Sequence, residues 1–129
     1  MTDVARFERD VLIEAIHEAD AQRIVRAAAS LEAGGEPLPL LLWTLCEELR
    51  TMMSIAAGQR PRRFLQPERM AALAKTAKRH DDASFDRLLT LAHRIDLRAK
   101  GVESGDPWNS VVEMALGLAG KQVLADVAA

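Results

Sequence analysis

The stretch PLPLLLWTLCEELRTMMSIAA, residues 37–57, predicts the helix around which the rest of the fold is arranged. Its apolar side chains recur every three or four residues and would form one continuous face: Leu38, Leu41, Leu42, Leu45, Leu49, Met52, Met53 and Ala56. Leu40 and Trp43 extend the apolar surface around the first two turns. Because a helix that is apolar on nearly every side is buried on several sides, we expect this to be the central helix.

Five further helices are predicted from the same spacing and from residues that begin or end helices. They cover residues 7–19, 20–33, 67–80, 82–100 and 107–119, and residues 121–129 would add at most one more turn. Asp20 and Asp106 are expected N-caps, and Asp82 or Ser84 is expected to cap the fifth helix. The sequence therefore predicts an all-α fold, in which residues 1–129 form one compact bundle of about six helices.

Overall charge and cysteine content exclude several classes of protein. The 129 residues include 17 Lys and Arg against 19 Asp and Glu, and this net charge of -2 argues against a protein dominated by nucleic-acid binding. Cys46 is the only cysteine, so neither an internal disulfide nor a cysteine-based zinc site can form. The first residues do not form a signal peptide and no apolar run approaches a membrane span, so we expect a cytoplasmic protein with no membrane contact.

Positive charge is concentrated in residues 60–80, which we name the basic segment. Residues 1–59 carry 5 basic and 10 acidic side chains, whereas the basic segment carries 7 basic and 1 acidic. Its cations are candidate contacts for phosphate or for an acidic partner: Arg60, Arg62, Arg63, Arg69, Lys75, Lys78 and Arg79. The alternative is a solvated loop and helix face. Phe64 is the only aromatic residue among them, so a stacking platform for single strands is poorly supported.

Residues that could carry catalysis are few. No glycine-rich phosphate-binding loop is present, so the chain has no evident means of binding ATP. Glu14 and His17 have the Glu-x-x-His spacing of di-iron bundles, but only one copy exists, and we expect a surface pair. Capping, packing or an interface explains the other candidates more simply: His80, Asp81, Asp82, His93 and Cys46. We therefore predict no catalytic, cofactor-binding or metal-binding residues, and no enzyme activity in this domain.

Two tryptophans are candidates for contact with a partner protein. Trp43 lies opposite Leu45 on the predicted central helix, so it faces either another helix of the chain or a partner. Trp108 lies near the start of the last predicted helix, and each tryptophan can equally belong to the core. Because tryptophan supplies a large contact area at interfaces, we take Leu40, Trp43 and Trp108 as the candidate partner interface.

Several of these stretches together suggest a family. They are residues 3–7, Asp20 with Arg23, GEPLPLLLWTLCEELR at 35–50, DLRAKG at 96–101, PWNSVVEMALGLA at 107–119 and LADV at 124–127. Each is weak alone, but their order and spacing run through most of the chain. In this respect the chain resembles the C-terminal domain of the delta subunit of the bacterial DNA polymerase III clamp loader.

The resemblance implies a role in assembly. In that family, the C-terminal domain is helical and packs with the corresponding domains of the tau/gamma and delta-prime subunits into a circular collar. The chain would then be the C-terminal fragment of a longer protein that supports loading of the sliding clamp in DNA replication, and it would reach the clamp and DNA only through the whole complex. It would need no cofactor. Separated from its neighbours, an exposed apolar face would favour non-native self-association.

A different function also fits the sequence. The chain could be an independent helical adaptor, or a nucleic-acid-binding module that uses the basic segment, residues 60–80. The resemblance assigns no role to the arginines at 60–63, so it does not separate these functions.

Overall fold

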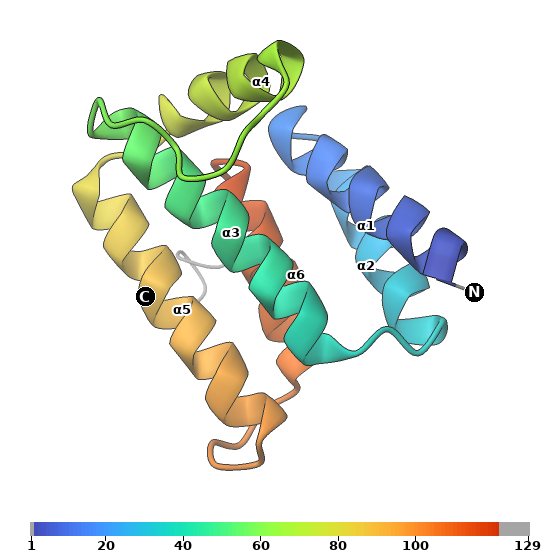
Figure 1. Ribbon diagram of the computed structural model, residues 1–129. Coiled ribbons are helices and arrows are strands. Elements are labelled where there is room, and N and C mark those ends of the chain that lie inside the picture. Colours follow the sequence, from blue (N-terminus) through green and yellow to red (C-terminus); the bar gives the residue numbers. More distant parts are fainter. Residues whose placement is uncertain (1, 122–129) are drawn as a thin grey trace.

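Six α-helices and no strand make up the part of the chain that the computed structural model describes, residues 2–121 (Figure 1). The helices are α1 (Thr2–His17), α2 (Ala21–Ala33), α3 (Leu38–Ala56), α4 (Pro67–Ala77), α5 (Asp82–Ala99) and α6 (Pro107–Leu118). The predicted all-α bundle is therefore confirmed. The further turn predicted within residues 121–129 lies almost wholly outside the described residues.

Local sequence signals determine most helix ends. The Asp20 and Asp106 side chains accept hydrogen bonds from the backbone N–H groups of Arg23 and Trp108, as expected of N-caps. The prediction for α5 is wrong by one residue, because Asp81 is its N-cap and accepts from the Ser84 N–H at 2.8 Å. The segment after α3 turns at Gly58, where a φ of 74° favours glycine.

Two boundaries differ from the predictions by a full turn. Helix α1 begins at Thr2 rather than at residue 7, and no glycine or proline in residues 2–6 would prevent that extension. Helix α4 ends at Ala77 rather than near His80. The residues that follow Ala77 instead hydrogen-bond to the ends of other helices, as described below.

The helices form two groups, with α4 lying across one end (Figure 1). Helices α1 and α2 pack against each other, and α3 contacts α4, α5 and α6. Helix α6 contacts α1, α2, α3 and α5, so it joins the two groups. The prediction that α3 is buried on several sides is wrong for its outer face, where Leu40 and Trp43 are exposed, and for Ala56, which is exposed in the last turn of the helix. Helix α6, rather than α3, is therefore the helix that contacts most of the other helices.

The hydrophobic core lies where the apolar stripes of all six helices meet. Its largest fully buried side chains are Leu12, Ile16, Ile24, Leu31, Leu41, Leu45, Leu49, Met52, Leu73, Ile95, Met114 and Leu118. Each such side chain stabilises the fold by about 1.5–3 kcal/mol through removal from water. None of the described helices is both long enough and apolar enough to cross a membrane.

Truncation of a core leucine tests this assignment. Leu45→Ala should lower the free energy of unfolding by about 2–5 kcal/mol, because it leaves a cavity among packed side chains. Leu89→Ala is the matched control, since Leu89 on α5 is 42% exposed, and it should change stability by about 0.5 kcal/mol or less. Urea denaturation followed by circular dichroism measures both. Equal losses would contradict the assignment of Leu45 to the core.

Candidate functional site

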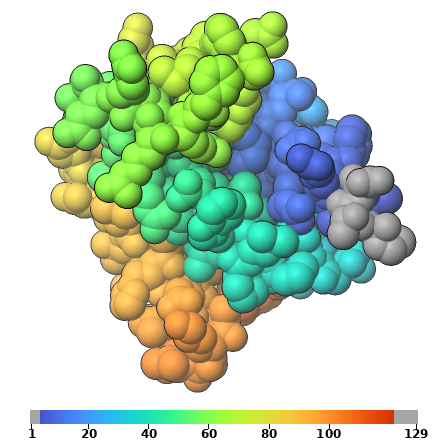
Figure 2. Space-filling view, in the orientation of Figure 1, coloured from blue at the N-terminus to red at the C-terminus, as the bar shows by residue number. Residues whose placement is uncertain are grey.

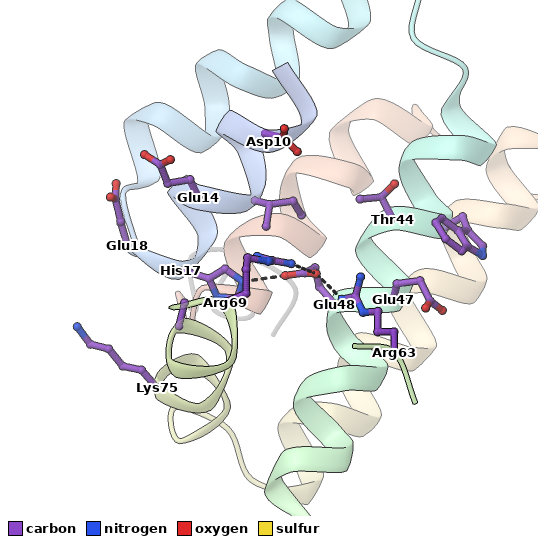
Figure 3. A pocket seen from close by; sticks show the side chains of 13 residues that line it. Asp10, Glu14, His17, Glu18, Thr44, Glu47, Glu48, Arg63, Arg69 and Lys75 are labelled. Carbon is purple, nitrogen blue, oxygen red and sulfur yellow. Dashed lines mark hydrogen bonds and ion pairs between the residues drawn. The ribbon is translucent and has the colours of Figure 1, made fainter. Parts of the chain in front are cut away.

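A groove of about 680 Å³ lies between α1, α3 and α4 (Figure 3). Figure 2 shows α1, α3 and the loop that leads to α4 on one face of the molecule. The groove is lined by Asp10, Ile13, Glu14 and His17 of α1 and by Glu18 directly after it, by Trp43, Thr44, Glu47 and Glu48 of α3, by Arg63 of the loop before α4, and by Arg69, Ala72 and Lys75 of α4. It is the place where the structure gathers titratable side chains from segments far apart in the sequence.

The Glu48 carboxylate is the centre of this cluster. Its side chain is 3% exposed. One carboxylate oxygen accepts a hydrogen bond from His17 Nε2 at 2.8 Å. The other accepts from the Nη2 atoms of Arg63 and Arg69, each at 2.8 Å (dashed lines in Figure 3). A single carboxylate therefore connects α3 to α1, to the loop after α3 and to α4.

His17 extends this network to α4. Its Nδ1 lies 2.7 Å from Thr76 Oγ1, which itself lies 2.9 Å from the Ala72 carbonyl oxygen. Nε2 is bonded to Glu48 and Nδ1 to Thr76, so neither ring nitrogen has a position open to a substrate.

The predicted surface pair of Glu14 and His17 is wrong for His17. That side chain is 6% exposed, whereas Glu14 is exposed and pairs with Arg23 of α2 at 3.2 Å. The prediction failed because His17 is buried by its contact with Glu48, which lies 31 residues away and on another helix. Helical spacing within residues 7–19 carries no sign of that contact.

Opposing effects act on the pKa of Glu48. Burial disfavours the charged form and raises the pKa, but the hydrogen bond from His17 and the guanidinium groups of Arg69 and Arg63 outweigh it. The net result lowers the pKa from 4.5 to about 2. Glu48 is therefore ionised at neutral pH, and as a weak base with both oxygens already hydrogen-bonded it is poorly suited to accept a proton from a substrate.

A second buried carboxylate joins α1 to the loop before α3. The Glu36 side chain is 2% exposed and accepts two hydrogen bonds from Arg9 Nη1, at 2.9 and 2.7 Å. Glu36 belongs to the GEPLP stretch that opens residues 35–50. Its burial means that the acidic residue of this stretch has a structural role, since removal of Arg9 would leave an uncompensated charge.

The basic segment is not one free cationic surface. Arg63 and Arg69 bind Glu48, and Arg79 donates to the backbone carbonyls of His17 at 2.9 Å and Ala119 at 3.1 Å. These carbonyls lie at the C-terminal ends of α1 and α6, where a cation also interacts favourably with the helix dipole. Of the seven cations, Arg60, Arg62, Lys75 and Lys78 form neither an ion pair nor a side-chain hydrogen bond with any described residue. Three of the seven predicted contacts thus have a structural use.

The other candidate residues have separate locations. His80 bonds to the Leu118 carbonyl at 2.8 Å and to the Ser84 hydroxyl at 2.6 Å, so capping explains it and its neighbour Asp81. His93 was expected to be partly buried or at an interface; it is exposed, which excludes the first of these and leaves the second untested. Cys46 is half-buried against the core, and burial raises the pKa of its thiol despite the opposing effect of Arg50. A half-buried thiol with a raised pKa has low reactivity, because the thiolate is the reactive form.

The three predicted interface residues do not share one surface environment. Leu40 and Trp43 lie one turn apart on α3 and are 42% and 60% exposed. Trp108 is half-buried and packs against the core. The structure therefore keeps Leu40 and Trp43 as candidates for contact with a partner and assigns Trp108 mainly to packing.

Neither metal geometry nor comparison with known proteins adds to this description. In the described part of the chain, no group of three or more His, Cys, Asp or Glu side chains is arranged to hold a metal ion. Comparisons of the chain with protein-family models, with curated proteins and with solved structures gave no match.

The Glu48 network predicts a specific loss of stability in acid. Because the pKa of the folded carboxyl is about 2 rather than 4.5, its contribution is complete above about pH 5 and is lost as the pH falls toward 2. That contribution is on the order of 3 kcal/mol. Glu48→Gln should lower the free energy of unfolding by about 3 kcal/mol at neutral pH, and should show a shallower fall in stability over this range.

Urea titrations at a series of pH values measure the effect. Asp86→Asn is the control, because Asp86 is exposed on α5 and its substitution should leave the pH profile unchanged. A Glu48→Gln profile parallel to that of the wild type would show that the network does not stabilise the fold.

Proposed function

We propose that this chain is an assembly domain of a clamp-loader delta subunit, which packs with the C-terminal domains of tau/gamma and delta-prime subunits in a collar. The proposal begins from the sequence resemblance in residues 35–50 and 107–119. In the all-α fold these residues form the first part of α3 and the whole of α6. An all-α fold and the absence of an available catalytic base at Glu48 both suit a domain that binds proteins rather than substrates.

The observation that carries the proposal is the exposed apolar surface at the start of α3. Trp43 is 60% exposed and Leu40 is 42% exposed, although the same helix buries a full stripe on its other side. Tryptophan is enriched at interfaces because one ring buries a large area when a partner covers it. We expect neighbouring subunits to cover this surface.

Substitution of the two tryptophans separates assembly from stability. Trp43→Ala should leave the melting temperature within about 3 °C of the wild type, and should weaken binding to the partner subunits about tenfold or more. Trp108→Ala should lower the melting temperature by about 6 °C or more, because it removes packing against the core. Thermal denaturation and co-purification with the loader subunits are the two measurements.

The opposite result for Trp43 would remove the main support for the proposal. If Trp43→Ala unfolds the domain while binding to the subunits survives in the folded fraction, this residue belongs to the fold and not to an interface.

One observation favours nucleic-acid binding as a second function. In the loop before α4, Arg60 and Arg62 are exposed and form no ion pair with residues 2–121, and Phe64 is 85% exposed. The bond from Arg63 to Glu48 holds the loop on the bundle. A loop of this kind can combine phosphate contacts with stacking on one base.

Joint substitution of Arg60 and Arg62 by alanine distinguishes the two functions. Under the assembly proposal, this variant should bind the loader subunits as the wild type does, because neither side chain lies at the exposed surface of α3. Under the nucleic-acid alternative, the wild type binds DNA without loader subunits, and the variant reduces the slope of log K against log salt by about 2. Fluorescence anisotropy with a labelled oligonucleotide at several salt concentrations measures that slope.

A further inference from the structure

We propose that the groove between α1, α3 and α4 receives a helical segment of a neighbouring subunit that carries arginine or lysine side chains. The inference rests on the proposed function, since it assigns a surface and a partner chemistry to collar assembly. It also uses residues that the sequence did not single out, chiefly Asp10, Thr44 and Glu47.

Acidic side chains line both walls of the groove. Asp10 and Glu14 of α1 and Glu18 of the following turn are spaced four residues apart, and the Glu18 N–H still bonds to the Glu14 carbonyl at 2.9 Å, so the three form one row. Glu47 lies on the opposite wall, on α3 (Figure 3). The row gives the groove a repeat of about one helical turn, which matches the spacing of side chains on a helix lying alongside.

The existing cations leave this negative charge available to a partner. The cations that line the groove, Arg63, Arg69 and Lys75, all lie at its α4 end, and Arg63 and Arg69 both bind the buried Glu48. Glu14 and Glu18 pair with Arg23, and Glu47 pairs with Arg50 three residues further along α3 at 2.9 Å. Glu14, Glu18 and Arg50 have side chains that are more than half exposed, so these surface pairs are weak. Asp10 forms no ion pair among the described residues. An incoming arginine can therefore bind these carboxylates without breaking the Glu48 network.

Trp43 adds a contact that suits the same partner. Its exposed indole lines the groove beside Glu47, and Leu40 precedes it by one turn of α3. A guanidinium group that stacks on the indole can reach a carboxylate at the same time, which favours arginine over a neutral side chain. Leu40 offers an apolar contact to the aliphatic part of the same segment.

The volume limits what can enter. About 680 Å³ is within the size range of small-ligand pockets, so it admits a few side chains. The partner backbone must then lie across the opening and insert side chains from one face. A helix with basic residues three or four positions apart meets this requirement.

Site-specific crosslinking in the assembled loader tests the occupant. A photo-reactive residue replaces Thr44 in the groove, and a second variant carries it at Leu89 on the exposed side of α5. The Thr44 position should crosslink to a partner segment with two or more basic residues at helical spacing, and the Leu89 position should not crosslink to that segment. Mass spectrometry of the crosslinked peptides identifies the segment.

The outcomes separate this inference from the proposed function. If the loader assembles but Thr44 crosslinks to no subunit, to a segment without basic residues, or to residues 122–129 of its own chain, the groove inference is overturned and the assembly function stands. If the chain does not join the loader subunits at all, the proposed function and this inference both fail.

A charge reversal tests the electrostatic part. Asp10→Lys should weaken binding to the partner subunits roughly tenfold at low salt, and the loss should shrink as salt is added. Asp86→Lys on α5 is the control of equal charge change, and its effect should be about twofold or less. Equal effects would show that net charge, and not the groove, controls binding. If the lysine variant unfolds, Asp10→Asn replaces it and should weaken binding to the partner subunits, with about half the loss in binding free energy.

Discussion

The buried carboxylate of Glu48 is the constraint on which the arrangement of this domain depends. A charge removed from water is tolerated only where opposite charge and hydrogen bonds surround it. Here the partners of Glu48 come from α1, from the loop after α3 and from α4. Displacement of any one of these segments would leave part of the buried negative charge of Glu48 without a partner. This contact explains part of the uneven charge along the chain, because two arginines of the basic segment, Arg63 and Arg69, neutralise an acidic residue of the preceding segment.

What the sequence predicted correctly was local. Helix positions followed from apolar spacing, and Asp20 and Asp106 capped the helices that they precede. The contacts of His17 could not be predicted in the same way, because its partners Glu48 and Thr76 lie 31 and 59 residues away. The prediction of which side of α3 is buried was limited in a similar way. Its pattern showed two apolar sides, but only tertiary packing decided that Leu45 faces the core and Trp43 faces outward.

The two proposals concern one region of the molecule. Exposed apolar side chains at the start of α3 border the groove whose opposite wall is the acidic row of α1. Apolar area and charge therefore lie side by side, as in interfaces where burial supplies affinity and charge supplies selectivity. The Glu48 network beneath the groove keeps its walls in position.

The contacts of Arg79 have a consequence for dynamics. One guanidinium holds the final carbonyls of α1 and α6, and it follows directly on α4. A displacement of α4 away from the bundle would uncover the ends of both helices at once. We therefore expect α1, α4 and α6 to open together, as one cooperative unit in native-state hydrogen exchange.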